Sequence, residues 1–201
     1  DVTIDEIYQS IGEYFGLGTD VILAMLAEEK RLEIEFCRPR KSVKQLYDFA
    51  ILLGKKVIFA SDMYIDEDTI RTILSKCGYE EYQKLYLSSS YRMTKHQGDL
   101  YRAVLKDLKV NAENVLHIGD NFQNDVTNAQ KYGINAVHFP RALDVFENMI
   151  ADIPTGGCST IAQFAGSTVV DSRVLIQSLG YRTMIAMIAN RYFDNPFRGF
   201  D

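Results

Sequence analysis

The feature that most constrains the fold is an alternation, after residue 55, of short apolar runs with helix-like segments. Four runs rich in strand-forming residues stand at positions 57–60, 84–87, 115–118 and 135–139. The first run, Val57 to Ala60, is continuously apolar, which is typical of a parallel strand that is covered on both faces. Because the segments between them are short and have helical apolar spacing, the sequence predicts an α/β fold with a Rossmann-like parallel sheet.

The residues before this alternation contain no strand-like run. A capping-box sequence, Thr3 to Glu6, precedes apolar residues at helical spacing, and that spacing continues to Gly54, a typical helix-ending glycine. Beyond Pro140 the pattern is weaker, but mostly helical. We therefore expect a helical region at residues 1–53, an α/β core at 54–150, and a mostly helical C-terminal extension or linker at 151–201.

Composition and charge exclude several classes of protein. The chain has 201 residues, 47% of them hydrophobic, which is enough to bury a core, and a net charge of −5 with both signs mixed. There is no basic stripe for nucleic acid or an anionic membrane, and no apolar stretch of the roughly 18–20 residues that a membrane span needs. The three cysteines lie far apart without metal-binding spacing, which favours a reduced, cytoplasmic protein.

Polar residues stand where ligands bind in open parallel sheets, beyond the carboxyl ends of the strands. Ser61 and Asp62 follow the first strand. A hydroxyl together with unpaired backbone N–H groups at a strand end can bind a phosphate oxygen. However, Ser and Asp are also common in ordinary turns. Lys95 lies in the loop before the expected helix at 97–108. A lysine at such a place is more often simply solvated than functional.

Two acids, Asp120 and Asp125, surround the turn after the third strand. Gly119 permits a sharp turn there, and the two carboxylates can converge on Mg²⁺, which takes one or two carboxylates together with waters and phosphate oxygens. Helix capping explains one acid at this place but not the pair. A hydroxyl, an ammonium and a carboxylate pair at the mouth of one sheet are the groups that hold a phosphate and its metal.

The stretches VIFASDMY, TKHQGDLY and HIGDNFQNDVTNA resemble, in this order, the second, third and fourth motifs of the haloacid dehalogenase-like (HAD) superfamily. These proteins are mostly Mg²⁺-dependent phosphatases, and the resemblance covers residues 55–140. It implies a HAD core whose helical cap corresponds to residues 1–53. By residue, it implies phosphate binding by Ser61 and the backbone N–H of Asp62, charge neutralisation by Lys95, and Mg²⁺ ligation by Asp120 and, directly or through water, Asp125.

The first motif of that family, an apolar strand followed by DxD, has no counterpart in this chain. Asp66 to Asp68 matches the pattern DxD, but these residues are expected to begin a helix. Asp62 follows a strand but has no second acid at the required spacing. Without the attacking aspartate there is no phosphoenzyme route, so we expect this chain alone to be inactive. The chain also lacks an initial Met, and we expect a fragment whose nucleophile strand lies upstream of Asp1, leaving a gap in the sheet unless another segment fills it.

Our first interpretation is a Mg²⁺-dependent HAD-like phosphohydrolase whose substrate is a small phosphorylated metabolite such as a sugar phosphate. The stretches DVTIDEIYQ and FDNPFRGF also resemble HAD-like regions beside glycosyltransferase domains in bacterial polysaccharide-biosynthesis proteins. That resemblance implies a covalently linked glycosyltransferase domain as a partner. It also leaves an alternative, a non-catalytic HAD-derived scaffold or interaction domain within such a protein.

Two other features carry less weight. A receiver-like α/β domain with a phosphorylatable aspartate ranks last, because it needs an acid pair after its first strand and does not explain the helices of residues 1–53. The three histidines, His96, His117 and His138, are scattered. We expect packed or hydrogen-bonded histidines rather than metal ligands.

Overall fold

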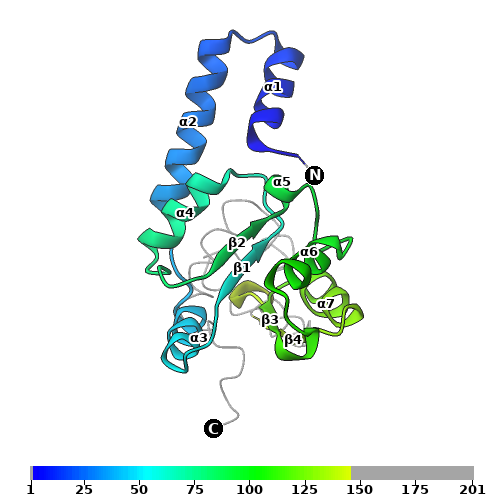
Figure 1. Cartoon of the computed structure of the whole chain (residues 1–201). Helices are drawn as coiled ribbons and strands as arrows, with labels where there is room; N and C mark the ends of the chain where they lie inside the picture. The colour runs from blue at the N-terminus through cyan, green and yellow to red at the C-terminus, as the bar shows by residue number, and fades with distance from the viewer. Residues whose placement is uncertain (1, 146–201) are drawn as a thin grey trace, which may run out of the picture. The chain divides into compact units, whose positions relative to one another are not determined.

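The computed structural model describes residues 2–145, and the chain divides into two units, Asp1–His138 and Phe139–Asp201. The elements of the first unit are labelled in Figure 1. In chain order they are α1 (Ile4–Phe15), α2 (Thr19–Phe36), α3 (Lys41–Leu52), β1 (Ile58–Ser61), α4 (Glu67–Lys76), β2 (Lys84–Leu87), α5 (Ser88–Tyr91), α6 (Asp99–Leu108), β3 (Leu116–Gly119), α7 (Asn128–Lys131) and β4 (Asn135–His138). The four expected strands and the three N-terminal helices are confirmed. The division into cap, core and extension stays a prediction, and residues 151–201 lie outside the described residues.

Two helix starts follow from local side-chain chemistry. At α1 the Thr3 hydroxyl accepts a hydrogen bond from the Glu6 N–H at 3.2 Å, and the Glu6 carboxylate accepts one from the Thr3 N–H at 2.8 Å, which completes the predicted capping box. At α4 the Asp66 carboxylate accepts from the Thr69 N–H at 3.0 Å. The acids at positions 66–68 are therefore a helix start, as expected, and not a DxD motif.

The four strands form two parallel pairs. β1 pairs with β2, with Ser61 opposite Leu87, and β3 pairs with β4, with Gly119 opposite His138. Each strand thus has one edge without a strand partner among residues 2–145. The absence of the first motif, and the gap in the sheet that we expect from it, stay predictions.

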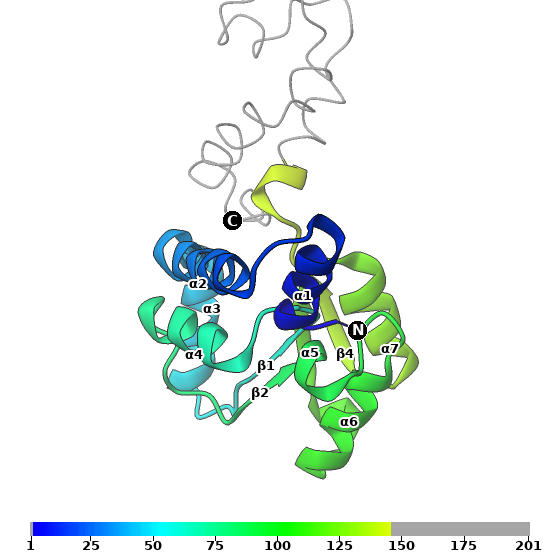
Figure 2. The ribbon, with the colours of Figure 1, turned by 90° about the horizontal axis from the view of Figure 1, so that it is seen from above.

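Helices lie on two sides of β1 and β2, whereas β3 and β4 expose alternate residues, among them Leu116, Ile118 and Val137. α3 and α4 lie on one side of the strands in Figures 1 and 2, and α6 and α7 lie on the other. Side chains of β1 alternate between them, since Phe59 packs with Tyr47 of α3 while Ile58 packs with Leu100 of α6. Both faces of β1 are therefore in contact with helices, and its residues are half-buried.

α6 connects the two strand pairs. Leu100 and Val104 pack with Tyr86 of β2. Tyr101 instead belongs to a second cluster with Ala129 of α7 and Ile134, against which Ala136 of β4 packs. Because adjacent positions on one helix serve different clusters, α6 fixes the two pairs relative to each other within the first unit.

α1 and α2 form a helical hairpin that packs at one end on the loop after β1. Ile4, Tyr8, Leu26 and Ile65 make a buried cluster there, and the Ile4 N–H donates to the Tyr64 carbonyl at 2.8 Å. The hairpin is therefore anchored beside the carboxyl end of β1. None of the helices within residues 2–145 is long and apolar enough to cross a membrane.

Candidate functional site

Three of the predicted site residues meet beyond the carboxyl ends of β1 and β3. The Asp62 carboxylate, directly after β1, accepts hydrogen bonds from the backbone N–H groups of Lys95 at 2.8 Å and His96 at 3.3 Å. The Lys95 Nζ donates to Asp125 Oδ1 at 2.5 Å. The turn at Lys95 therefore links the end of β1 to the helical segment that follows β3.

Asp125 is a buried carboxylate with partners on both oxygens. Its side chain is 1% exposed and that of Lys95 is 13% exposed. Oδ1 also lies 3.2 Å from His117 Nε2, and Oδ2 accepts from the Asn121 N–H at 2.9 Å. Burial of a carboxylate is tolerated only when its charge and its lone pairs are compensated in this way.

The surroundings keep Asp125 ionised. Burial raises the pKa of the Asp125 carboxyl, but the hydrogen bond to His117 and the hydrogen bond and charge of Lys95 lower it by more, and the result lies well below the usual range. Burial and the charges of Asp125 and Asp62 raise the pKa of Tyr101. Tyr101 therefore stays a neutral hydroxyl, which donates to the Asn124 carbonyl at 2.9 Å.

Gly119 is required by the close approach of Asp125. A Cβ at position 119 would lie 2.3 Å from Asp125 Cγ, a distance that real Cβ atoms do not show. The Asn121 side chain then accepts from the Asn124 N–H at 2.9 Å and starts a π-helical segment, Phe122–Thr127. The glycine and the capping asparagine together place the Asp125 carboxylate against the end of β3.

Sequence analysis missed two residues that support this arrangement. His117 was expected to be packed or hydrogen-bonded, and the structure confirms a hydrogen bond, but its partner is Asp125. Asn128 Nδ2 donates to the carbonyls of Lys95 at 3.1 Å and His96 at 2.7 Å, which holds the Lys95 turn. The sequence did contain a signal for His117. Residues two apart on a strand point to the same face, so His117 lies on the same face of β3 as Gly119, which Asp125 contacts.

Ser61 and Asp120 lie at the two strand ends. Ser61 is the last residue of β1 and is half-buried. Asp120 directly follows β3, its side chain is exposed, and its backbone carbonyl lies 3.0 Å from His138 Nε2. Their predicted roles in phosphate and metal binding stay predictions.

The donor set suits a magnesium ion in part. No group of three or more His, Cys, Asp or Glu side chains that could hold a metal occurs within residues 2–145. Asp120 offers an exposed carboxylate directly after β3. Both Asp125 oxygens accept hydrogen bonds from the protein. Because Mg²⁺ keeps several waters, Asp120 fits as a direct ligand and Asp125 as a group that acts through water.

Part of the chain matches a known protein family. Residues 58–139 match the family of haloacid dehalogenase-like hydrolases, which confirms the HAD resemblance and the α/β fold for this part of the chain. No curated protein matches the chain. A solved structure that is similar is the crystal structure of a HAD phosphatase from Thermococcus onnurineus, with 11% identity, coverage of 83% of this chain and 90% of that chain, and a TM-score of 0.42.

The contact between Gly119 and Asp125 can be tested by adding one methyl group. Gly119→Ala should lower the free energy of unfolding by about 1–3 kcal/mol, because the new Cβ forces the Asp125 carboxylate out of its site. Gly18→Ala is the matched control, since nothing lies within 4 Å of the added Cβ there. Urea unfolding measures both variants, and equal effects would show that the close approach does not exist.

The lowered pKa of Asp125 predicts a specific pH dependence. Its folded-state pKa lies below the unfolded value of about 3.9, so its stabilisation is complete above that pH and is lost as the pH falls through the folded-state pKa. Asp125→Asn should therefore cost about 3 kcal/mol at pH 7 and less below about pH 4. Urea unfolding between pH 2.5 and 7, with EDTA present, measures the difference.

The control for this experiment is Asp107→Asn. The Asp107 carboxylate pairs with Lys84 at 2.6 Å, but both side chains are at least 40% exposed. Solvent screens this surface pair, so its removal should cost much less than the removal of Asp125. A cost at Asp125 that is as small as that at Asp107, or that does not change with pH, contradicts the assignment.

Proposed function

We propose that the chain is a fragment of a Mg²⁺-dependent HAD-like phosphohydrolase that acts on a small phosphorylated metabolite such as a sugar phosphate. The observation that carries the proposal is the buried Lys95–Asp125 pair at the ends of β1 and β3. The family of residues 58–139 supports a hydrolase, and the substrate class and the metal are our own inference.

The Lys95 ammonium is the central group of the proposed site. It has three N–H donors, and Asp125 takes one of them. The side chain is 13% exposed, so its remaining donors are available for phosphoryl oxygens without full hydration. In this proposal Ser61 and the backbone N–H of Asp62 bind the same phosphoryl group, and Asp120 ligates the metal, which supplies charge neutralisation for phosphoryl transfer.

The attacking carboxylate is proposed to arrive on a strand upstream of Asp1. That strand inserts between β1 and β3 and converts the two pairs into one five-stranded sheet. Two observations support it, namely the edge without a strand partner on β1 and on β3 within the described residues, and the link between their carboxyl ends through Asp62, Lys95 and Asp125. An inserted strand would satisfy backbone groups along both edges.

The setting of the protein is proposed from the sequence resemblance alone. We place it in the bacterial cytoplasm, covalently linked to a glycosyltransferase domain that serves polysaccharide biosynthesis. The composition supports neither a nucleic-acid partner nor a membrane span. The phosphorylated product or precursor of such a glycosyltransferase is a natural substrate class for the site.

A non-catalytic scaffold is the second candidate. It is favoured by Asp125, because hydrogen bonds from the protein occupy both of its oxygens and the pair with Lys95 is complete without a ligand. In this alternative the site residues are retained for stability and hold the two strand pairs together.

One experiment separates the two candidates. A polypeptide extended upstream of Asp1 is assayed with Mg²⁺ against a panel of phosphate esters that includes sugar phosphates, beside the same polypeptide carrying Asp120→Asn. The phosphohydrolase predicts turnover that Asp120→Asn lowers by at least about 10³-fold, because a metal ligand is lost. The exposed Asp107→Asn is the control and should leave turnover unchanged. A folded, extended polypeptide without turnover supports the scaffold.

A further inference from the structure

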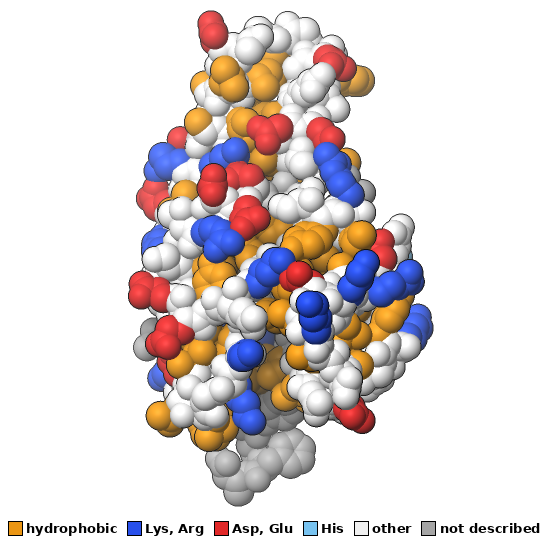
Figure 3. Space-filling view, viewed as in Figure 1, with side chains coloured by type: hydrophobic (Ala, Val, Ile, Leu, Met, Phe, Trp, Pro, Cys, Tyr) orange, Lys and Arg blue, Asp and Glu red, His pale blue; other side chains and the backbone are white. Residues whose placement is uncertain are grey.

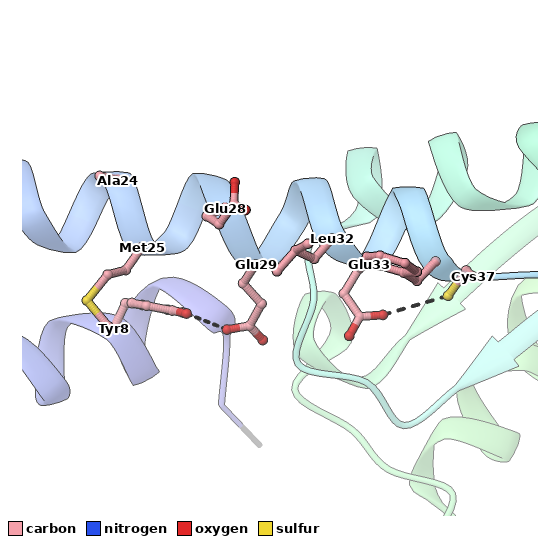
Figure 4. Close-up of a pocket in the computed structure, with 9 residues that line it drawn as sticks. Tyr8, Ala24, Met25, Glu28, Glu29, Leu32, Glu33 and Cys37 are labelled. Atoms are coloured by element: carbon pink, nitrogen blue, oxygen red, sulfur yellow. Dashed lines mark hydrogen bonds between the residues drawn. The ribbon is translucent and has the colours of Figure 1, made fainter. Parts of the chain in front are cut away.

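An open groove runs along α2 beside α1. Its volume is about 950 Å³, and eight of its nine lining residues belong to α2 or its C-terminal end, while Tyr8 comes from α1. Figure 4 shows these side chains spread along α2, with Tyr8 of α1 pointing toward Glu29. The lining extends from Ala24 to Cys37, which corresponds to about four helical turns and about 20 Å.

The apolar lining residues lie on one stripe of α2. Met25, Leu32 and Phe36 follow each other at i, i+7 and i+11, and Val21 continues the stripe one turn earlier. Their side chains are 40%, 38%, 67% and 48% exposed. A stripe with this period normally packs against another element, and here it faces solvent in the part of the chain that the structure describes.

The neighbouring face of α2 is already packed. Ile22 and Leu26 belong to the buried cluster with Ile4 and Ile65. α2 therefore has two apolar sides, of which one builds the hairpin and the other forms the floor of the groove. The exposed side is not needed to hold α2 on the first unit.

Acidic side chains stand among the apolar ones. The Glu29 carboxylate accepts hydrogen bonds from the Tyr8 hydroxyl at 2.5 Å and the Tyr64 hydroxyl at 3.1 Å, and Glu33 accepts one from the Cys37 thiol at 3.7 Å. Neither glutamate has an ion-pair partner among residues 2–145. The bond to Glu29 also raises the pKa of Tyr8 to about 12, so this hydroxyl remains a donor to the carboxylate.

The charge of the groove decides between possible occupants. Symmetric pairing of α2 with α2 from a second copy would bring glutamates opposite glutamates, which is unfavourable. A compact small molecule prefers an enclosed pocket, whereas this groove is elongated and follows one helix. Hydrophobic, acidic and basic side chains are interspersed over the α1–α2 hairpin in Figure 3, but the residues that line the groove include three glutamates and no Lys or Arg. This surface is complementary to an element that is both apolar and basic.

We infer that the groove binds a basic amphipathic helix of a partner polypeptide. Apolar side chains of that helix, spaced at i, i+3, i+4 and i+7, insert between Met25, Leu32 and Phe36, and its Lys or Arg residues lie near Glu29 and Glu33. The interaction goes beyond the proposed phosphohydrolase activity and does not depend on it.

The test uses a synthetic 18-residue helical peptide of leucine and lysine, with leucines at i, i+3, i+4 and i+7, and calorimetry with the full chain. We expect saturable 1:1 binding that weakens with salt. The double substitution Leu32→Ser with Phe36→Ser should weaken binding at least tenfold, and Glu33→Gln about threefold to fivefold with a smaller salt dependence. All the changed side chains line the groove, and circular dichroism checks that each variant is folded.

Matched variants outside the groove serve as controls. Leu23→Ser changes a leucine of α2 that is 57% exposed and does not line the groove, and Glu13→Gln changes an exposed acid of α1. Both should bind the peptide as the unchanged chain does. The inference is overturned if the peptide does not bind, if a leucine–glutamate peptide of the same pattern binds equally well, or if the control variants lose as much affinity as the groove variants.

Discussion

The contact between Lys95 and Asp125 is the interaction on which the candidate site depends. A carboxylate that is 1% exposed pays a large desolvation cost, and only a charged partner with further hydrogen bonds offsets it. Lys95 provides the charge, while His117 and the Asn121 N–H provide the remaining hydrogen bonds. Lys95, His117 and Asn121, which are distant or separate in the sequence, thus together stabilise one ionised carboxylate at the end of β3.

The same contact also joins two parts of the fold. The Lys95 turn is held on one side by Asp62, which follows β1, and on the other by Asn128 of α7. α6, which starts after this turn, packs against both strand pairs. The ends of β1 and β3 are therefore fixed near one another although their strands are not paired. Strand ends that are held close together suit the proposed phosphohydrolase, and they also suit a scaffold.

Local signals predicted much of this structure. Apolar runs gave the four strands, and the capping box at Thr3 and the glycine at position 54 marked helix ends, because these effects act within a few residues. Ser61, Lys95 and Asp125 could be recognised as candidates because each stands beyond a strand or before a helix. The HAD resemblance, confirmed for residues 58–139, supplied the order in which they belong together.

Other features depend on contacts between distant residues and could not be predicted. The separation of the strands into two pairs reflects which edges meet in space, and apolar spacing contains no information about that. The segment after Asn121 was expected to be an ordinary helix, but it begins as a π-helix, since Asp125 must approach Gly119 closely. The partner of His117 depends on the same backbone path. The groove also depends on tertiary contacts, because helical apolar spacing does not show which face of α2 stays exposed.

A double-mutant cycle tests the central claim most directly. Lys95→Met, Asp125→Asn and the combined variant are unfolded with urea at pH 7, and the coupling free energy between the two positions is calculated. A buried, jointly desolvated pair predicts a coupling of at least about 2 kcal/mol, because either single substitution leaves the other charge or its hydrogen bonds uncompensated. A coupling below about 0.5 kcal/mol would contradict the account, since the two side chains would then act independently.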